Sequence, residues 1–305
     1  MIAFLAKRVL WLVATVWVVF TVSFFLMRAV PGGPFSGDRA LTPEIEANFK
    51  REYDLDKPLA AQYAIALKKA VVDQNLGYCM KLDDYVSRVI VAGLPISAAL
   101  GLLSLALAFT VGLTAGIVSA VWRGAGIDVG LMSIATIGIA LPNFIVAGFA
   151  ILLFVFLIPL LPAGGWGSFR QLILPAVCLG APYAAYVARI ARTGMLDVLS
   201  QDHIRTARAK GLAPATIVLR HAMPTAMLPV VSFLGPAVAG VLTGSPVVEQ
   251  IFAIPGLGWH FVQSALQRDL TLSMGLVVMY TALLYTMNLL VDLSYSLLDP
   301  RVEWK

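Results

Sequence analysis

Residues 89–122 read VIVAGLPISAALGLLSLALAFTVGLTAGIVSAVW and contain no Asp, Glu, Lys or Arg. A charged side chain at the centre of a bilayer costs at least about 2.5–3.5 kcal/mol on insertion scales, so membrane-spanning helices avoid charges. An apolar helix of about 20 residues spans the hydrocarbon, and this stretch exceeds that length. It therefore predicts a transmembrane helix.

Further charge-free stretches lie on both sides of it. They are residues 9–27, 129–169, 171–188, 222–248 and 270–291. Each reaches the roughly 17–20 residues that a membrane helix needs. Together the stretches predict an all-α integral membrane protein with six transmembrane helices.

The composition also indicates that the protein lies in a lipid bilayer. Hydrophobic residues make up 59% of the chain and charged residues only 13%, which is outside the usual range of soluble domains. The net charge of +5 does not indicate nucleic acid, because the Lys and Arg residues are scattered between apolar runs. Cys79 and Cys178 have no Cys or His close by in sequence, so we expect neither a metal site nor a structural disulfide. The expected non-protein partner is membrane lipid.

The basic residues predict the orientation. Lys7 and Arg8 precede the run 9–27, which is longer than the roughly 7–15 apolar residues of a signal peptide. Residues 1–30 are therefore expected to form a first, uncleaved transmembrane helix. The short loops on one side carry most of the positive charge, which places both termini, with the tail 299–305, in the cytoplasm.

Residues 31–88 are then an external (periplasmic) segment between the first two helices. A Thr-Pro-Glu start predicts a short helix from about Pro43 to Tyr53. A second helix is expected after Pro58, where apolar residues recur at helical spacing. Such a segment is either a small helical cap on the membrane surface or a docking surface for an external partner, and the sequence leaves both open.

Two stretches need separate treatment. The run 250–267 is free of charge but is interrupted by proline, glycine and histidine, so we expect an interfacial or re-entrant loop and not a seventh span. The stretch 129–169 is longer than one helix needs. Its last part is rich in proline and glycine and contains Trp166, so the span is expected to end near Ile158.

The loop 192–221 holds most of the charge expected in the cytoplasm. Gly211 suits the end of a helix, and Pro214 suits the first turn of the next one. Arg205 and Arg208 lie three residues apart and share a basic face, with smaller apolar residues opposite. The loop is either an anchor on anionic lipid or an element that enters a groove of a soluble protein, and charge and spacing alone favour the anchor.

The string RTARAKGL at 205–212 resembles the loop motif of binding-protein-dependent ABC importer permeases, in the form of the oligopeptide, dipeptide and nickel subfamily. The general motif is Glu-Ala-Ala, three residues, then Gly. Ala207 and Gly211 match it, whereas Arg205 and Thr206 replace its first two residues.

The resemblance extends over essentially the whole chain and is greatest to the oligopeptide-type permease. Further similar stretches are residues 27–35, 221–222, 243–245, 247–249, 254–258 and 298–301. Residues 74–79 depart most from the subfamily pattern. The resemblance implies a type I ABC importer permease fold, with residues 89–298 as a five-helix core that contains the loop 192–221.

The resemblance also implies that the loop couples this chain to an ATPase subunit. The residues implied in coupling are Arg205, Thr206, Ala207, Arg208, Lys210, Gly211, Leu212, Arg220 and His221. The implied partners are a second homologous permease in a heterodimer, one or two ABC ATPase subunits, an extracytoplasmic substrate-binding protein and a peptide. The implied location is the bacterial plasma (inner) membrane.

No catalysis or cofactor is expected in this chain. It lacks a Gly-x-x-x-x-Gly-Lys-Ser/Thr phosphate loop, so ATP and Mg are expected in the partner ATPase subunits. His203, His221 and His260 are far apart in sequence and do not indicate a metal site.

Breaks in the apolar stretches suggest further sites, although packing kinks give the same pattern. Residues considered for the translocation pathway are Pro142, Asn143, Thr243 and Ser245. Residues considered to face the binding protein are Glu249, Pro255, Gly256 and Gly258. Gly112 and Gly116 form a small-xxx-small pair that favours close helix packing.

Two other classes of function stay open at this point. A secondary transporter or channel independent of ATP would usually place an ionisable residue in mid-membrane, and Glu249 and Asp292 lie only at the ends of the predicted spans. A membrane receptor is supported only by the long external segment.

Overall fold

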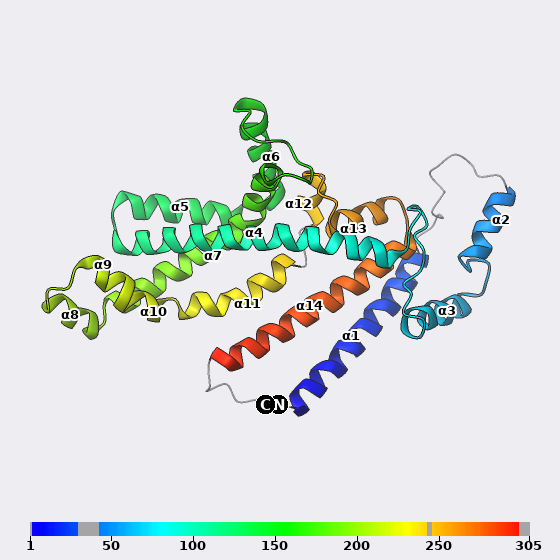
Figure 1. Cartoon of the computed structure of the whole chain (residues 1–305), viewed down its shortest axis with the longest axis horizontal. Coiled ribbons are helices and arrows are strands. Elements are labelled where there is room, and N and C mark those ends of the chain that lie inside the picture. The colour runs from blue at the N-terminus through cyan, green and yellow to red at the C-terminus, as the bar shows by residue number, and fades with distance from the viewer. Residues whose placement is uncertain (1, 30–42, 243–245, 299–305) are drawn as a thin grey trace. The chain divides into compact units, whose positions relative to one another are not determined.

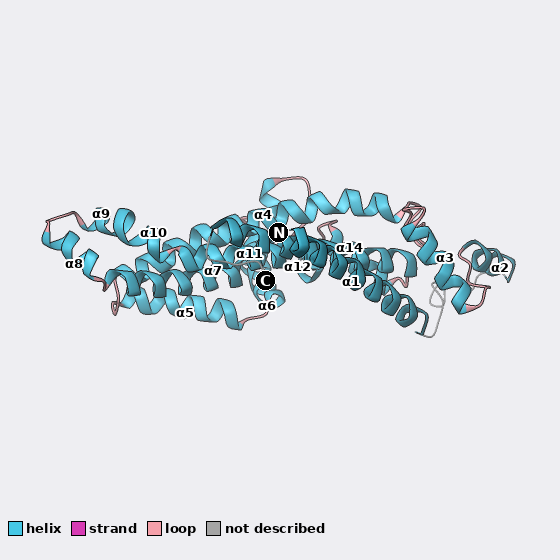
Figure 2. Ribbon diagram, turned by 90° about the horizontal axis from the view of Figure 1, so that it is seen from below, coloured by secondary structure: helices cyan, strands magenta, loops and turns pink. Residues whose placement is uncertain are grey.

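A computed structural model describes residues 2–29, 43–242 and 246–298 of the chain. In these ranges the regular elements are helices (Figure 1). A view turned by 90°, coloured by structure type, shows the helices joined by loops (Figure 2). The elements of the first half are α1 (Ile2–Ala29), α2 (Pro43–Glu52), α3 (Leu59–Val71), α4 (Val86–Val121), α5 (Gly126–Ala140), α6 (Asn143–Ile151) and the π-helical η1 (Leu152–Leu157). Those of the second half are α7 (Phe169–Leu199), α8 (Asp202–Ala209), α9 (Pro214–Thr216), the π-helical η2 (Ile217–Ala222), α10 (Met223–Ala226), α11 (Leu228–Leu242), α12 (Pro246–Ile251), α13 (Leu257–Leu266) and α14 (Leu270–Leu298).

Four helices are long and apolar enough to cross a membrane, namely α1, α4, α7 and α14. Two bent pairs also meet this test when each pair is taken as one span, which gives up to six spans in the described residues. The six charge-free stretches of the sequence therefore correspond to four continuous helices and two bent segments. The helix α13 has 10 residues and is too short to be a span of its own.

The sharper bend lies between α5 and α6. The two helices meet at 111°, and η1 ends at Leu157, next to the predicted end of the span at Ile158. Leu141 is extended, with ψ 129°, because the proline that follows disfavours helical geometry at the preceding residue. The sequence predicted an interruption at Pro142 and Asn143, and in the structure the chain changes direction at these residues.

The chain divides into two compact units, and the division falls within α4 and within α14. The first unit comprises the described residues up to Ile96 together with Pro255–Leu289. The second unit comprises Ser97–Ile254 and the described residues from Leu290 onward.

The first unit contains the predicted external segment. Both predicted helices are present as α2 and α3, and α3 is tied to α1. The hydroxyl groups of Thr21 and Tyr63 share a 2.8 Å hydrogen bond, and Arg28 Nε donates to Gln62 Oε1 at 2.7 Å. A core of buried side chains lies where the segment enters α4, formed by Cys79, Val86, Val89, Ile90, Leu257, Leu272 and Leu276.

The buried carboxylate of Asp269 connects two segments of this unit by hydrogen bonds. It is 1% exposed and accepts hydrogen bonds from the backbone N–H of Lys81, at 3.0 Å, and of Leu272, at 2.9 Å. The second bond caps the first turn of α14, where a carboxylate also interacts favourably with the helix dipole. Asp269 thus joins the external segment to the start of a transmembrane helix.

The second unit is built around α7, which packs against α5, α6, α10 and α11 (Figure 1). It also lies very close to α4. A Cβ added at Gly112 would lie 2.5 Å from the carbonyl oxygen of Ala184, and one added at Gly116 would lie 2.5 Å from that of Ala188. The small-xxx-small pair therefore serves close helix packing, as the sequence indicated.

Candidate functional site

The loop after α7 has the helix–glycine–helix form that the sequence predicted. Helix α8 begins at Asp202, whose carboxylate lies in the positive first turn, and ends at Ala209, with Lys210 as its C-cap. Gly211 follows with φ +74°, a left-handed conformation that glycine adopts without strain. Its N–H donates to Arg208 O at 2.9 Å, and Pro214 then starts α9 at a position that needs no N–H donor.

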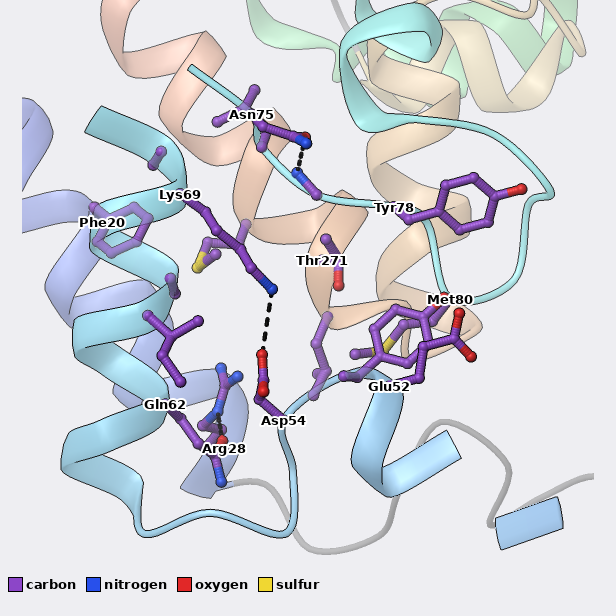
Figure 3. Close-up of a pocket in the computed structure, with 18 residues that line it drawn as sticks. Phe20, Arg28, Glu52, Asp54, Gln62, Lys69, Asn75, Tyr78, Met80 and Thr271 are labelled. Carbon is purple, nitrogen blue, oxygen red and sulfur yellow. Dashed lines mark hydrogen bonds and ion pairs between the residues drawn. The ribbon is translucent and has the colours of Figure 1, made fainter. Parts of the chain in front are cut away.

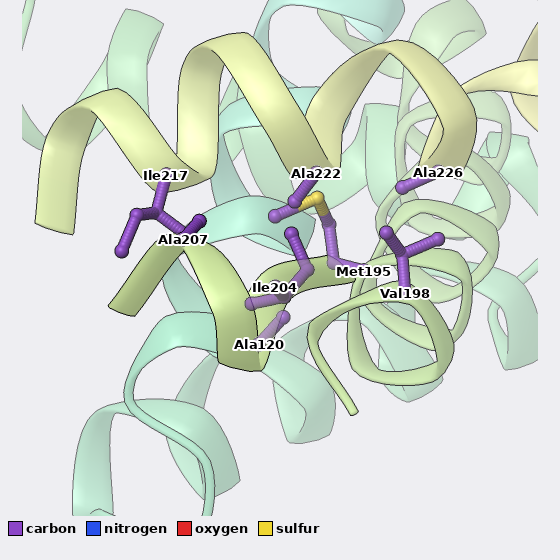
Figure 4. Close-up of a cluster of buried hydrophobic side chains, with 8 residues drawn as sticks. All are labelled: Ala120, Met195, Val198, Ile204, Ala207, Ile217, Ala222 and Ala226. Carbon is purple, nitrogen blue, oxygen red and sulfur yellow. The ribbon is translucent and has the colours of Figure 1, made fainter. Parts of the chain in front are cut away.

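Helix α8 is held by its apolar side. Ile204 is completely buried and Ala207 is 6% exposed. Figure 4 shows both within a cluster that also contains Ala120, Met195, Val198, Ile217, Ala222 and Ala226. Ala120 belongs to α4, and Met195 and Val198 belong to α7, so α8 packs against the ends of two long helices.

The opposite side of the loop is open. Of the residues predicted to couple, the following are exposed: Arg205, Thr206, Arg208, Lys210, Gly211, Leu212, Arg220 and His221. Ala207 is the exception, since it lies in the internal cluster. The ion pair between Arg205 and Asp202, at 3.3 Å, is fully solvated and leaves the basic face accessible.

The residues predicted for a pathway are only partly described. Pro142 is exposed and Asn143 is half-buried at the bend between α5 and α6. Thr243 and Ser245 lie outside the described residues.

The four residues predicted to face a binding protein are mostly internal. Glu249 has no exposed surface, and Gly256 and Gly258 are buried, whereas Pro255 is partly exposed. Ser97 Oγ donates a hydrogen bond to Glu249 Oε1 at 2.8 Å. The proposal that Glu249, Pro255, Gly256 and Gly258 face a binding protein stays a prediction, and in this arrangement of the chain Pro255 offers the most accessible surface of the four.

An ion pair that the sequence did not reveal lies between α5 and α7. Arg192 Nε and Nη2 donate to Asp128 Oδ1 and Oδ2 at 2.8 and 2.9 Å. The two residues are 64 positions apart, and Asp128 only bordered a charge-free stretch. The one available signal was an isolated acid at the start of a long apolar run.

A cavity of about 250 Å³ lies in the first unit, lined by polar and apolar residues of α1, α3, α14 and the segments 52–54 and 75–80 (Figure 3). Two of the charged residues that line it, Asp54 and Lys69, form an ion pair. Lys69 Nζ lies 3.2 Å from Asp54 Oδ2, and Lys57 Nζ lies 2.6 Å from Asp54 Oδ1. The hydrogen bond from Lys57 is the largest cause that lowers the pKa of the Asp54 carboxyl. These contacts join α3 to the turn that precedes it, within the segment 43–85.

Comparison with known proteins adds the family. Residues 112–304 match the family described as binding-protein-dependent transport system inner membrane component, and residues 1–101 match its N-terminal part. The chain belongs to this family. The resemblance inferred from the loop motif is therefore confirmed.

Named relatives match over their full length. The oligopeptide transport system permease protein OppB of Salmonella typhimurium, like that of Escherichia coli K12, is 40% identical over 307 residues, which is 100% of both chains. The dipeptide transport system permease protein DppB of Bacillus subtilis is 41% identical over 303 residues, covering 99% of this chain and 98% of the relative.

Solved structures agree on the fold. An inward-facing form of the MetNI methionine ABC transporter gives a TM-score of 0.55 at 20% identity over 70% of this chain and 97% of that one. A structure described as an amino acid ABC transporter with histidines gives 0.52 at 20% identity over 71% and 95%.

Membership of the family shows what kind of membrane protein this chain is. It is a multi-pass inner-membrane permease subunit of an ABC importer, not an enzyme, and ATP is hydrolysed in partner subunits. Permeases of this family work with ATPase subunits and a substrate-binding protein. The alternatives of an ATP-independent transporter and of a receptor are therefore set aside.

Proposed function

We propose that this chain is the oligopeptide-type permease of a peptide importer and that it pairs with a second, homologous permease in a heterodimer. The observation that carries the proposal is full-length identity of 40% to permeases named for oligopeptide transport. The similar identity to a dipeptide permease keeps the substrate class at peptides and leaves their length to experiment.

Helix α8 has two faces that suit a coupling role, one basic and exposed and the other apolar and buried. Arg205, Arg208 and Lys210 are exposed cations that a groove on an ATPase subunit with acidic side chains would attract. Ile204 and Ala207 fix the same helix to α4 and α7. In our proposal, ATP-driven closure of the ATPase subunits moves α8, and the two long helices change between inward-open and outward-open arrangements.

The bend at Pro142 and Asn143 is our candidate for part of the translocation pathway. A sharp bend frees backbone groups from helical hydrogen bonds, and such groups are tolerated in a membrane where protein or water covers them. Thr243 and Ser245 remain candidates from the sequence. We place both termini in the cytoplasm and the segment 31–88 outside, on the distribution of positive charge.

The test is to tag this chain, purify its complex from bacterial membranes and reconstitute it in proteoliposomes. We expect an ATPase subunit and a second permease to co-purify, and ATP hydrolysis to rise when the binding protein is added with a pentapeptide. Parallel assays with a dipeptide and with nickel ions compare the substrate classes. Stimulation by nickel alone, or co-purification without any ATPase subunit, would contradict the proposal.

A second test reverses the charge of the exposed basic face of α8. Arg205→Glu combined with Arg208→Glu leaves the internal cluster untouched, because neither side chain belongs to it. We expect this variant to reach the membrane but to retain less ATPase subunit. Arg170→Glu is the matched charge reversal outside the loop, at an exposed position in the first turn of α7.

A further inference from the structure

The carboxylate of Asp128 is the centre of a compact hydrogen-bond network in the second unit. Asp128 is 3% exposed. Besides both bonds from Arg192, it accepts a short bond from Ser119 Oγ and one from the N–H of Gly124 at 2.9 Å. Four donors thus surround one buried acid and satisfy it.

The network joins three helices. Ser119 lies in α4, Gly124 in the turn after it, Asp128 in the first turn of α5, and Arg192 in α7. A guanidinium that donates two parallel hydrogen bonds to one carboxylate fixes both distance and orientation, which a single contact or an apolar patch does not. The pair is partly buried, with Asp128 enclosed and the side chain of Arg192 27% exposed. Such a pair is weak evidence for stability, because apolar residues of similar volume often stabilise equally well. Stability alone therefore does not explain the two-point geometry of the Asp128–Arg192 pair.

The network also adjoins the cluster that holds α8. Ala120 follows Ser119 directly in α4, and Met195 lies in the turn after Arg192 in α7. Both contact the cluster that buries Ile204 and Ala207, whereas α5 contributes no residue to the buried members of that cluster. A movement of α8 therefore reaches α5 by way of α4 and α7, and the Asp128–Arg192 pair is the polar joint between them.

We propose that Asp128 and Arg192 are positioning residues for energy coupling, which make α5 follow the movement that α8 imparts to α7. The inference rests on the proposed role of α8. The consequence is specific, because α5 leads into the bend at Pro142. When the Asp128–Arg192 pair is intact, α5 and the bend after it move together with α7. Without the pair, α7 moves relative to α5.

The test measures distances within this subunit in the complete complex with its ATPase subunits, in lipid nanodiscs. Spin labels are placed on cysteines at Ile134, which is 69% exposed on α5, and at Gln201, which is exposed just before α8. A second label pair between Gln201 and the ATPase subunit reports whether the loop moves when ATP and vanadate trap the complex. The distance measurements need no transported substrate, whereas the ATP hydrolysed per peptide is measured separately in proteoliposomes.

With the native pair, we expect the distance between positions 134 and 201 to stay the same on trapping, since the elements move as one body. With Asp128→Asn, we expect it to change or broaden on trapping. Arg189→Gln removes an exposed charge from the same helix without touching the pair and is expected to behave like the native protein.

The double variant Asp128→Asn/Arg192→Met separates positioning from mere stabilisation, because it leaves no buried charge unpaired. A purely stabilising pair predicts that this variant regains native distances. A positioning pair predicts that it stays loose, and that ATP hydrolysed per peptide transported rises by roughly fivefold or more. Arg192→Lys, which keeps the charge but loses the two-point geometry, is expected to be intermediate.

The outcomes distinguish this inference from the proposed function. If the loop moves on trapping and Asp128→Asn keeps native distances, the positioning role is overturned and the proposed function stands. If the loop of the native complex does not move on trapping, both are overturned.

Discussion

Ser97 Oγ donates a 2.8 Å hydrogen bond to Oε1 of Glu249, a carboxylate with no exposed surface. The two residues come from α4 and α12, which are 152 positions apart in sequence. Glu249 thus has a structural role inside the second unit, although the sequence suggested a charge at the end of a span.

This bond gives the first prediction. Glu249→Ala removes the acceptor of the buried hydrogen bond from Ser97 and most of a fully buried side chain, which we expect to cost about 1–3 kcal/mol of stability. Glu249→Gln keeps the volume and an acceptor oxygen, so it should cost less. Thermal unfolding of the purified subunit in detergent measures both. Equal unfolding temperatures for Glu249→Ala and the native protein would contradict the role.

The close approach of α4 and α7 predicts opposite effects of the same substitution at two glycines. At Gly116 a Cβ would meet a carbonyl oxygen of α7 at 2.5 Å, so Gly116→Ala should destabilise by about 1–3 kcal/mol. At Gly130 in α5 nothing lies within 4 Å, so Gly130→Ala should stabilise by up to about 1 kcal/mol through helix propensity. Parallel unfolding curves check the pair, and destabilisation at both glycines would refute the packing explanation.

The conformation of Gly211 predicts which substitutions the loop tolerates. Proline cannot adopt φ +74° and lacks the N–H that bonds to Arg208 O, so Gly211→Pro should abolish peptide uptake with the protein still in the membrane. Asparagine adopts the left-handed region more readily than other residues, and a Cβ here meets nothing within 4 Å. Gly211→Asn should therefore retain most uptake. Normal uptake by an assembled Gly211→Pro complex would count against a coupling turn at this position.

The surroundings of Cys79 predict a pH dependence. Burial, followed by the negative charges of Asp269 and Asp84, raises the pKa of the thiol to about 12. The folded state therefore keeps the proton when the unfolded state, with a pKa of about 8.5, has lost it. The stability from this group is complete below about pH 8.5 and is lost as the pH rises through the folded pKa.

Alkylation with iodoacetamide checks this prediction by mass spectrometry. Cys79 should react slowly from pH 7 to pH 9 in the folded subunit and rapidly after unfolding in detergent, since the thiolate is the reactive form. A cysteine introduced at Ser200, which is exposed, is the control. Equal rates at both sites in the folded subunit would show that Cys79 is not shielded.

The sequence predicted those features that depend on local composition. Charge-free stretches located the four continuous helices, because each charge in the bilayer has a large cost wherever it lies. They did not locate every helix end, since α7 continues past residue 188 to Leu199 and includes Arg192, which the sequence had assigned to the loop 192–221. The glycine and proline of the loop 205–214 likewise predicted its turn, since both act through their own backbone geometry.

Features that depend on distant residues were not predictable. The bend at Pro142 was visible as a break, but its angle of 111° also depends on packing in the second unit. Asp128 and Arg192 carry no local signal of pairing across 64 positions. Burial of Glu249 follows from the path of α12 in three dimensions, which a charge near the end of an apolar run does not reveal.

Crosslinking from the basic loop in native membranes is the most direct test of the account. Cysteines at Arg205 and at Leu212, both exposed, carry a short photoactivatable crosslinker, and a cysteine at Val72, which is 68% exposed in the segment 43–85, is the control. The account predicts adducts with an ATPase subunit from the two loop positions and none from Val72. Absence of ATPase adducts from both loop positions, with the subunit present in the membrane, would contradict it.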